Sequence, residues 1–497
     1  MIFAMYKKPA TMKVTTKFIR MKITFIIFIS GLLSYNQLHA QTNFSGTWNG
    51  TLNVAGQLHL VLHVTQLNDG TYSGKLDSPD QNVAGIVCDK VESASDSSGN
   101  TLTFTIDKLH VSYTGKLLND TTLSGIFTQG AKVPLDFHRN DVPYVAKQIN
   151  RPQTPKPPFP YKSEEVIYNA NGLQYGGTIT IPQGDGTFPA VLLITGSGQQ
   201  DRDETIFGHK PFAVLADALT RDGFIVLRVD DRGVGNSNGN FAASTTADFV
   251  NDVNASIDYL KTRHEVNDKK VGLLGHSEGA MIAPIVASQR KDIDFIVLMA
   301  APGVKIIDLM AEQNAAVMRS SGIDFPFSEK YKLLYTHLIT TIINTPDTAT
   351  AKRNALQILN NWQANADSND LRKLGIYSQN NNEAYINQLI AACSTPWFKY
   401  FIQFDPQPYL TKLKKVKTLA LNGSKDIQVV SQQNLPAVRS ALVDGRTRTF
   451  TVKELPGLNH LFQTCTTCTV SEYGQLEETI APVALQTITS WLNDNVK

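Results

Sequence analysis

The chain has 497 residues, more than one hydrophobic core usually organises, so its length predicts two or three domains. The composition is that of a globular protein, with 42% hydrophobic and 18% charged residues. The 46 basic and 44 acidic residues leave a formal net charge of +2. Such a balance creates no strong field, which argues against nucleic acid or an anionic membrane as the partner.

The N-terminal 40 residues have the pattern of an export signal. Basic side chains come before the apolar stretch 23–33, among them Lys13, Lys17, Arg20 and Lys22. A polar segment follows, and Ala40 suits a cleavage site. The apolar stretch is shorter than the ~20 residues of a membrane helix, so no membrane span is expected after signal removal. We predict a signal peptide over residues 1–40, with Met21 as an alternative start, and a periplasmic or secreted protein.

Residues 42–140 show the period-two pattern of β-strands. Alternating stretches such as "LHLVLHV" (58–64) and "TLTFTI" (101–106) are separated by Gly, Asn and Asp, and no helical period interrupts them. The pattern predicts a small all-β domain, either a barrel or a sandwich. Its aromatic residues leave a carbohydrate-binding role open, although a residue such as Trp48 is more often part of a core.

Six prolines between Pro143 and Pro160 mark a domain boundary. Proline fixes φ and keeps the chain extended, so residues 141–163 are expected to form a stiff, solvated linker. The pattern changes after this segment, and residues 164–497 are predicted to form a second domain.

The second domain alternates short apolar runs with helical stretches. The runs include "AVLLITG" (190–196), "VGLLGHS" (271–277) and "TLALNG" (418–423). Continuous apolar strands separated by helices indicate a mostly parallel, doubly wound α/β sheet, whose chemistry collects at the carboxyl ends of the strands. A helical insertion at about 303–400 interrupts this rhythm. It is either a cap over the active face or an elaboration of the packing, and its place at that edge favours the cap.

Ser277 lies in "GHSEG", directly after an apolar run and before a helix-compatible segment. Gly275 and Gly279 remove side chains where a sharp strand-to-helix turn would make them collide. Such a turn exposes the serine Oγ beside the positive end of the next helix. The motif therefore predicts a nucleophile, provided that partner residues exist elsewhere, since a Gly-Ser-Gly turn alone has no chemistry.

A serine nucleophile needs a general base and an acid that orients the base. His460 lies in a loop after the last predicted strand and is the leading base, with His209 as a weaker rival. His276 is expected to be structural, because it points away from the cleft if Ser277 points into it. Asp426 follows the preceding strand and is the leading acid. An acid from another strand stays open, although Asp230 and Asp231 are expected to shape their loop with Arg232.

The negative charge that develops on a carbonyl oxygen needs fixed hydrogen-bond donors. The backbone N–H of Glu278 is one candidate, because it begins the helix after the nucleophile. The second candidate is Ser197, in "TGSGQQ" at the end of the third strand of this domain, with Gly198 as the alternative. Glycine in that loop lets the backbone approach a substrate closely.

Five motifs, in chain order, resemble an exported α/β-hydrolase of the esterase and serine-aminopeptidase-like group: "TGSGQQDRDE", "DDRGVGNSNG", "GHSEGA", "GSKDIQV" and "LNHLFQ". The resemblance covers about residues 161–497. It implies the α/β-hydrolase fold, a triad of Ser277, Asp426 and His460, and hydrolysis of carboxylic esters without a cofactor. The sequence departs from the group's pattern at Thr195, where a histidine is usual in the oxyanion motif.

The expected function is that of a serine hydrolase that cleaves small-molecule esters through an acyl-enzyme on Ser277. One alternative is a peptidase that uses the same triad, although the β-rich domain is too short for the propeller of large prolyl peptidases. Another is an inactive hydrolase fold that serves as a binding protein. The sequence carries no signal for an oligomeric state.

Four cysteines would face an oxidising compartment after export: Cys88, Cys393, Cys465 and Cys468. The "CTTC" pair follows His460 closely, so a local disulfide that clips this loop is a plausible arrangement. Zinc held by His460 and the two cysteines is the alternative. It would occupy the base and supplies only three of the usual four ligands, so no metal site is predicted.

Overall fold

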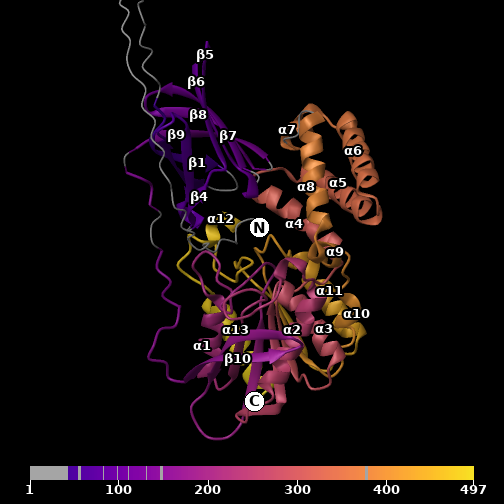
Figure 1. Cartoon of the computed structure of the whole chain (residues 1–497). Helices are drawn as coiled ribbons and strands as arrows, with labels where there is room; N and C mark the ends of the chain where they lie inside the picture. Colours follow the sequence, from indigo (N-terminus) through magenta and orange to yellow (C-terminus); the bar gives the residue numbers. More distant parts are fainter. Residues whose placement is uncertain are drawn as a thin grey trace, which may run out of the picture.

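The protein consists of two units, as seen in the computed structural model (Figure 1). The structure describes residues 43–497, apart from 54–56, 82, 98, 110, 130, 141, 146–148 and 375–378. The predicted signal peptide over residues 1–40 lies outside the described residues. No helix in the described part of the chain is long and apolar enough to cross a membrane.

The N-terminal unit is one nine-stranded antiparallel sheet in the order β4-β3-β2-β1-β9-β8-β7-β6-β5. Its strands are β1 (Gly46–Asn53), β2 (Gln57–Gln66), β3 (Tyr72–Ser78), β4 (Val83–Val87), β5 (Lys90–Asp96), β6 (Gly99–Ile106), β7 (Val111–Asn119), β8 (Thr122–Gln129) and β9 (Ala131–Arg139). Single 3-10 turns, η1 (Pro79–Gln81) and η2 (Asp107–Leu109), follow β3 and β6.

The two ends of this sheet approach each other, which favours the barrel over the sandwich. The Cys88 N–H, between β4 and β5, donates to the Gly74 carbonyl of β3 at 3.0 Å. Alternate side chains of the strands point inward and form one apolar core. Trp48 belongs to that core with 0% of its surface exposed, so it does not supply a carbohydrate-binding face.

The middle of the linker is docked on the second unit, so the prediction of a solvated linker is wrong for this part of it. The guanidinium of Arg151 donates to the carbonyls of Phe207, Gly474 and Leu476 at 2.6–3.0 Å. Gln153 hydrogen-bonds to the same C-terminal segment, at residues 479 and 480. Proline keeps the linker extended, but these two polar side chains attach it.

The second unit is built on an eight-stranded sheet in the order β10-β11-β13-β12-β14-β15-β16-β17. The strands are β10 (Lys162–Ala170), β11 (Leu173–Ile181), β12 (Phe188–Ile194), β13 (Ile225–Val229), β14 (Val266–His276), β15 (Phe295–Met299), β16 (Lys417–Gly423) and β17 (Phe450–Leu455). β10, β11 and β13 pair antiparallel, and all pairs from β13 to β17 are parallel. The apolar runs form the central strands, which are buried on both faces.

Helices cover both faces of this sheet. α1 (Pro211–Arg221) and α13 (Pro482–Asn495) pack together on one face. The other face carries α2 (Thr246–Leu260), α3 (Glu278–Gln289), α10 (Gln407–Leu410) and α11 (Ser431–Asp444). Two short elements, η3 (Phe241–Ala243) and α12 (Val470–Tyr473), lie in connecting loops.

Between β15 and α10 the described part of the chain forms six consecutive helices. They are α4 (Ile306–Ser320), α5 (Phe325–Asn344), α6 (Thr348–Asn365), α7 (Ser368–Leu374), α8 (Gln379–Ser394) and α9 (Pro396–Ile402). The β-rich unit and helices α5 to α8 extend from the same end of the second unit in Figure 1. This helical segment occupies the region where the sequence predicts an insertion.

Candidate active site

Ser277 lies at a sharp turn between β14 and α3 and adopts a strained backbone conformation. Its φ of 54° and ψ of −112° are uncommon for a residue with a Cβ atom. Such strain costs about 1–2 kcal/mol and persists only where the surrounding structure imposes it. The Ser277 N–H donates to the Met299 carbonyl at 2.9 Å, which anchors the turn to β15. The serine side chain is partly exposed.

The two flanking glycines are required by close backbone contacts. A Cβ atom on Gly275 would lie 2.1 Å from the Gly279 carbonyl oxygen, and one on Gly279 would lie 2.1 Å from the Ile194 carbonyl oxygen. No side chain fits at such distances. The first turn of α3 therefore packs directly against the end of β12, which brings the loop after β12 next to Ser277.

Asp426 and His460 are hydrogen-bonded to each other at the carboxyl ends of β16 and β17. His460 Nδ1 lies 2.8 Å from Asp426 Oδ2, and the exposed fractions of the two side chains are 6% and 0%. The other carboxylate oxygen of Asp426 accepts the backbone N–H groups of Gln428 and Val429 at 2.7 and 2.9 Å. Because an ionised carboxylate only accepts, Nδ1 carries the proton and Nε2 is left as the basic atom.

His276 connects the Ser277 turn to the loop that carries His460. It directly precedes Ser277, its ring centroid lies 4.8 Å from that of His460, and its Nε2 lies 3.0 Å from the His460 carbonyl oxygen. Among the described residues no hydrogen bond joins Ser277 Oγ to the His460 ring.

The loop after β12 lies against Ser277. A Cβ atom on Gly196 would be 3.4 Å from the Ser277 Cβ atom. Asp231 holds this loop, because its carboxylate accepts the Thr195 hydroxyl and the Gln200 N–H, both at 2.8 Å. Thr195, which departs from the usual oxyanion motif, thus anchors the loop to the end of β13.

The two predicted oxyanion donors lie on the two segments that meet here. Ser197 follows Gly196 in the loop after β12, and Glu278 is the first residue of α3. Among the described residues none accepts a hydrogen bond from the Glu278 N–H, as expected for the first turn of a helix. A negatively charged oxygen at this helix end would also be favoured by the helix dipole.

The Glu278 side chain makes a contact that the sequence did not reveal. It is buried, and its Oε1 atom accepts the Thr246 hydroxyl at 2.7 Å and the Trp397 indole N–H at 2.9 Å. Burial raises the pKa of Glu278 above the ordinary carboxyl value, although both hydrogen bonds act in the opposite direction. Trp397 belongs to α9, so the last helix of the inserted segment contacts the residue next to Ser277.

The rival candidates have structural partners. His209 is buried and its two ring nitrogens face the Thr479 hydroxyl and the Tyr473 carbonyl, both at 2.9 Å. Burial, with the nearby Arg151 charge, lowers the pKa of His209 to about 4. Asp230 pairs with Arg202 at 2.7 Å, whereas Arg232 binds Asp252. The prediction that Asp230 shapes its loop with Arg232 is therefore wrong about the partner.

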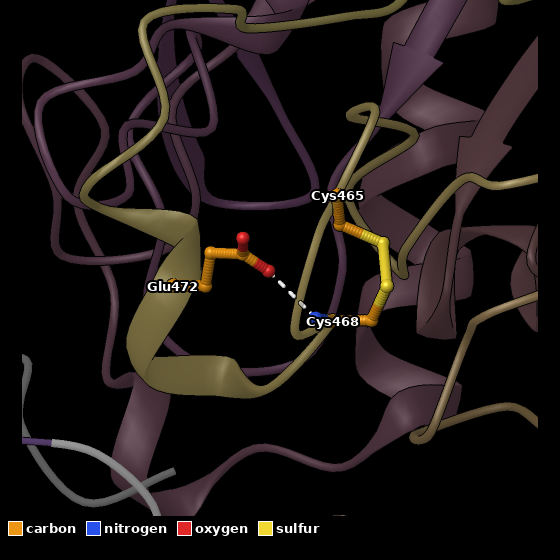
Figure 2. Close-up of side chains that lie close together, drawn as sticks. All are labelled: Cys465, Cys468 and Glu472. Carbon is orange, nitrogen blue, oxygen red and sulfur yellow. Dashed lines mark hydrogen bonds between the residues drawn. A yellow bond between two sulfur atoms is a disulfide. The ribbon is translucent and has the colours of Figure 1, made fainter.

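Cys465 and Cys468 form a disulfide a few residues after His460 (Figure 2). Glu472 caps this loop, because its carboxylate accepts the N–H groups of Cys468 and Thr466 at 2.6 and 2.9 Å. This arrangement does not fit a zinc ion held by His460 and the two cysteines. The two sulfurs are joined in a disulfide, and Nδ1 of His460 is hydrogen-bonded to Asp426. Cys88 and Cys393 are free and buried.

Comparisons with known proteins agree with the motifs. Residues 210–337 match the family model described as serine aminopeptidase, S33. Over 190 residues the chain is 36% identical to esterase EstD of Thermotoga maritima, a match that covers 38% of this chain and spans 45% of the length of that esterase.

Two esterase structures are similar at low sequence identity. Est1E from Butyrivibrio proteoclasticus, solved with ferulic acid, is 13% identical with a TM-score of 0.37, covering 67% of this chain and 99% of that chain. The Pyrococcus furiosus esterase Pf2001 is 14% identical with a TM-score of 0.40, covering 71% of this chain and 100% of that chain. The two sequence matches by themselves confirm the predicted resemblance to the esterase and serine-aminopeptidase-like group.

Proposed function

We propose that the protein is a serine hydrolase that cleaves carboxylic esters through an acyl-enzyme on Ser277. The observation that carries this proposal is the buried Asp426–His460 hydrogen bond at the strand ends where the strained Ser277 turn also lies. A strained serine between two sterically required glycines is typical of a nucleophile held at the top of a sheet. The 36% identical segment of a known esterase supports ester chemistry.

The proposed reaction has two steps. Ser277 Oγ attacks the ester carbonyl while His460 Nε2 takes its proton, and the proton then goes to the leaving alcohol. Asp426 holds the ring and stabilises the imidazolium that forms. The N–H groups of Ser197 and Glu278 bind the oxyanion, and such a donor is typically worth ~3 kcal/mol. A water molecule, activated by His460, then releases the acid.

We further propose that helices α4 to α9 form a cap that shapes the substrate site. The Trp397–Glu278 hydrogen bond supports this role, because it fastens the end of the inserted segment beside the nucleophile. A cap in this place excludes water and selects substrates by the shape of the acyl or alcohol group.

Export to the periplasm or the outside of the cell is also a proposal. The basic and apolar pattern of residues 13–33 supports it, and so does a disulfide, which persists in oxidising compartments. N-terminal sequencing of the protein from its native cell should begin just after Ala40. A mature protein that starts at Met1 or Met21 would contradict export by cleavage.

A peptidase with the same triad is the second candidate, favoured by the match to the serine aminopeptidase family. Purified protein should be assayed on short- and long-chain p-nitrophenyl esters and on aminoacyl anilides. We expect turnover of esters, covalent labelling of Ser277 by a fluorophosphonate, and loss of both in Ser277→Ala. Turnover of anilides alone would indicate the peptidase, and unlabelled Ser277 without any turnover would indicate a binding protein.

A further inference from the structure

Glu204 is a buried acid beside the proposed nucleophile that the mechanism above does not use. It lies in the loop between β12 and α1, and only 5% of its surface is exposed. Its φ of 53° places a residue with a long side chain in the left-handed region, which is uncommon outside glycine. Backbone strain of this kind concentrates at functional sites, where the surrounding structure maintains it.

One carboxylate oxygen of Glu204 binds two parts of the site. Oε1 accepts the Gly196 N–H at 2.7 Å and lies 3.0 Å from Nδ1 of His276. Gly196 belongs to the proposed oxyanion loop and His276 to the nucleophile turn. The Gly196 N–H is thereby occupied by the Glu204 carboxylate.

The ring of His276 lies between two acceptors. Nδ1 faces the Glu204 carboxylate, and Nε2 faces the carbonyl oxygen of His460 at 3.0 Å. A carbonyl and a carboxylate both accept hydrogen bonds, so the ring satisfies both partners only when each nitrogen carries a proton. Burial alone lowers the pKa of His276, but the charge and hydrogen bond of Glu204, the His460 carbonyl and the Asp426 charge outweigh it, and the pKa is raised.

We propose that Glu204 and His276 form a buried ion pair that positions the oxyanion loop and the His460 loop around Ser277. The pair spans Gly196, the nucleophile turn and the backbone of His460 through three consecutive hydrogen bonds. Both are positioning residues, since neither contacts the reacting atoms. The inference rests on the proposed function for its kinetic consequences, whereas the charge state of His276 does not depend on it.

The first test reads the charge of His276 directly. In protein labelled with ¹⁵N-histidine, we expect both ring nitrogens of His276 to stay protonated at about pH 8, well above the ordinary histidine value near 6.5. In Glu204→Gln one of them should be deprotonated at that pH. A neutral His276 in the unmodified protein at about pH 7 would overturn the ion pair, whether or not the protein hydrolyses esters.

The second test reads positioning through kinetics. Glu204→Gln keeps the side-chain shape and removes the charge, and we expect kcat on a p-nitrophenyl ester to fall roughly 10- to 100-fold with KM nearly unchanged, because small misplacements of reacting groups cost that much. As His276 now loses its proton near neutral pH, kcat should fall further on the alkaline side. Glu204→Asp, which retains the charge, should recover part of the rate and serves if the glutamine variant does not fold.

Asp203→Asn is the matched control, because it removes a carboxylate charge from the residue next to Glu204, whose partners are Lys210 and Arg228 rather than the Ser277 or His460 loops. It should lower the melting temperature while leaving kcat and its pH profile unchanged. A Glu204→Gln enzyme with the original kcat and pH profile would overturn the proposal. An unmodified protein that neither hydrolyses esters nor reacts with fluorophosphonate would instead refute the proposed function, and the NMR measurement would still decide the ion pair.

Discussion

The two oxygens of the Asp426 carboxylate have separate partners: Oδ2 accepts His460 Nδ1–H at 2.8 Å, and Oδ1 accepts only backbone N–H groups. In Asp426→Asn the amide oxygen can keep the backbone bonds while the NH₂ group faces Nδ1. That donor stabilises the wrong tautomer of His460, so we expect kcat to fall about 10³- to 10⁴-fold with little loss of stability. Ester turnover and thermal unfolding check this. A variant that loses stability but retains kcat would contradict the role of Asp426.

Glycine substitutions should separate folding from catalysis at the nucleophile turn. Gly279→Ala places a Cβ atom 2.1 Å from the backbone oxygen of Ile194, so we expect a loss of ~3 kcal/mol or more in the free energy of unfolding, or no folded protein. Gly196→Ala meets its nearest atom, Oε1 of Glu204, at 3.0 Å, and a side chain can move. It should fold and lose activity. Denaturant unfolding and ester turnover distinguish the two, and equal stability losses would contradict the prediction.

The buried carboxyl of Glu278 should make stability depend on pH. Because its pKa is raised in the folded chain, the folded chain keeps this proton to higher pH than the unfolded chain does. Stability therefore falls as the pH rises above the ordinary value of about 4.5. Glu278→Gln can still accept from Thr246 and Trp397 but does not titrate, so its stability relative to the unmodified protein should increase as the pH rises above about 4.5.

Urea unfolding at several pH values measures this difference. Glu92→Gln, which changes a largely exposed carboxylate of β5, is the control and should leave the pH dependence unchanged. Parallel pH dependences for Glu278→Gln and the unmodified protein would show that folding leaves the pKa of Glu278 unchanged, and would contradict the prediction.

The Cys465–Cys468 disulfide closes a loop of only four residues, so its contribution should be small. The chain-entropy relation gives about 2 kcal/mol for this length. We expect the Cys465→Ser, Cys468→Ser double variant to lose about that amount in denaturant unfolding. A thiol reductant should lower the stability of the unmodified protein equally and leave the variant unaffected, because the other two cysteines are free.

The docked linker should contribute to the stability of the second unit. Arg151→Ala leaves three backbone carbonyls without their charged donor, and we expect a loss of ~2 kcal/mol or more in the free energy of unfolding. Lys156→Ala, at an exposed position of the same linker, is the matched control. If both variants melt at the temperature of the unmodified protein, the linker is only a tether.

Local patterns in the sequence were sufficient to predict most strands and helices and the tight turn at Ser277. Continuous apolar runs predict buried parallel strands because such strands need apolar side chains on both faces, and period two predicts antiparallel strands with one buried face. The glycines around Ser277 indicate a tight turn for a steric reason that lies within a few residues.

Only the tertiary structure decided which distant residues meet. Glu204 and His276 are 72 positions apart, Glu278 and Trp397 are 119 apart, and Arg151 and Leu476 are 325 apart. None of these side chains carries a local pattern that names its partner, because the pairing follows from the order of the strands and from the return of the chain over the sheet. The sequence by itself therefore determined the strands, the helices and the turn at Ser277, and the packing of loops at one edge of the sheet determined the contacts around them.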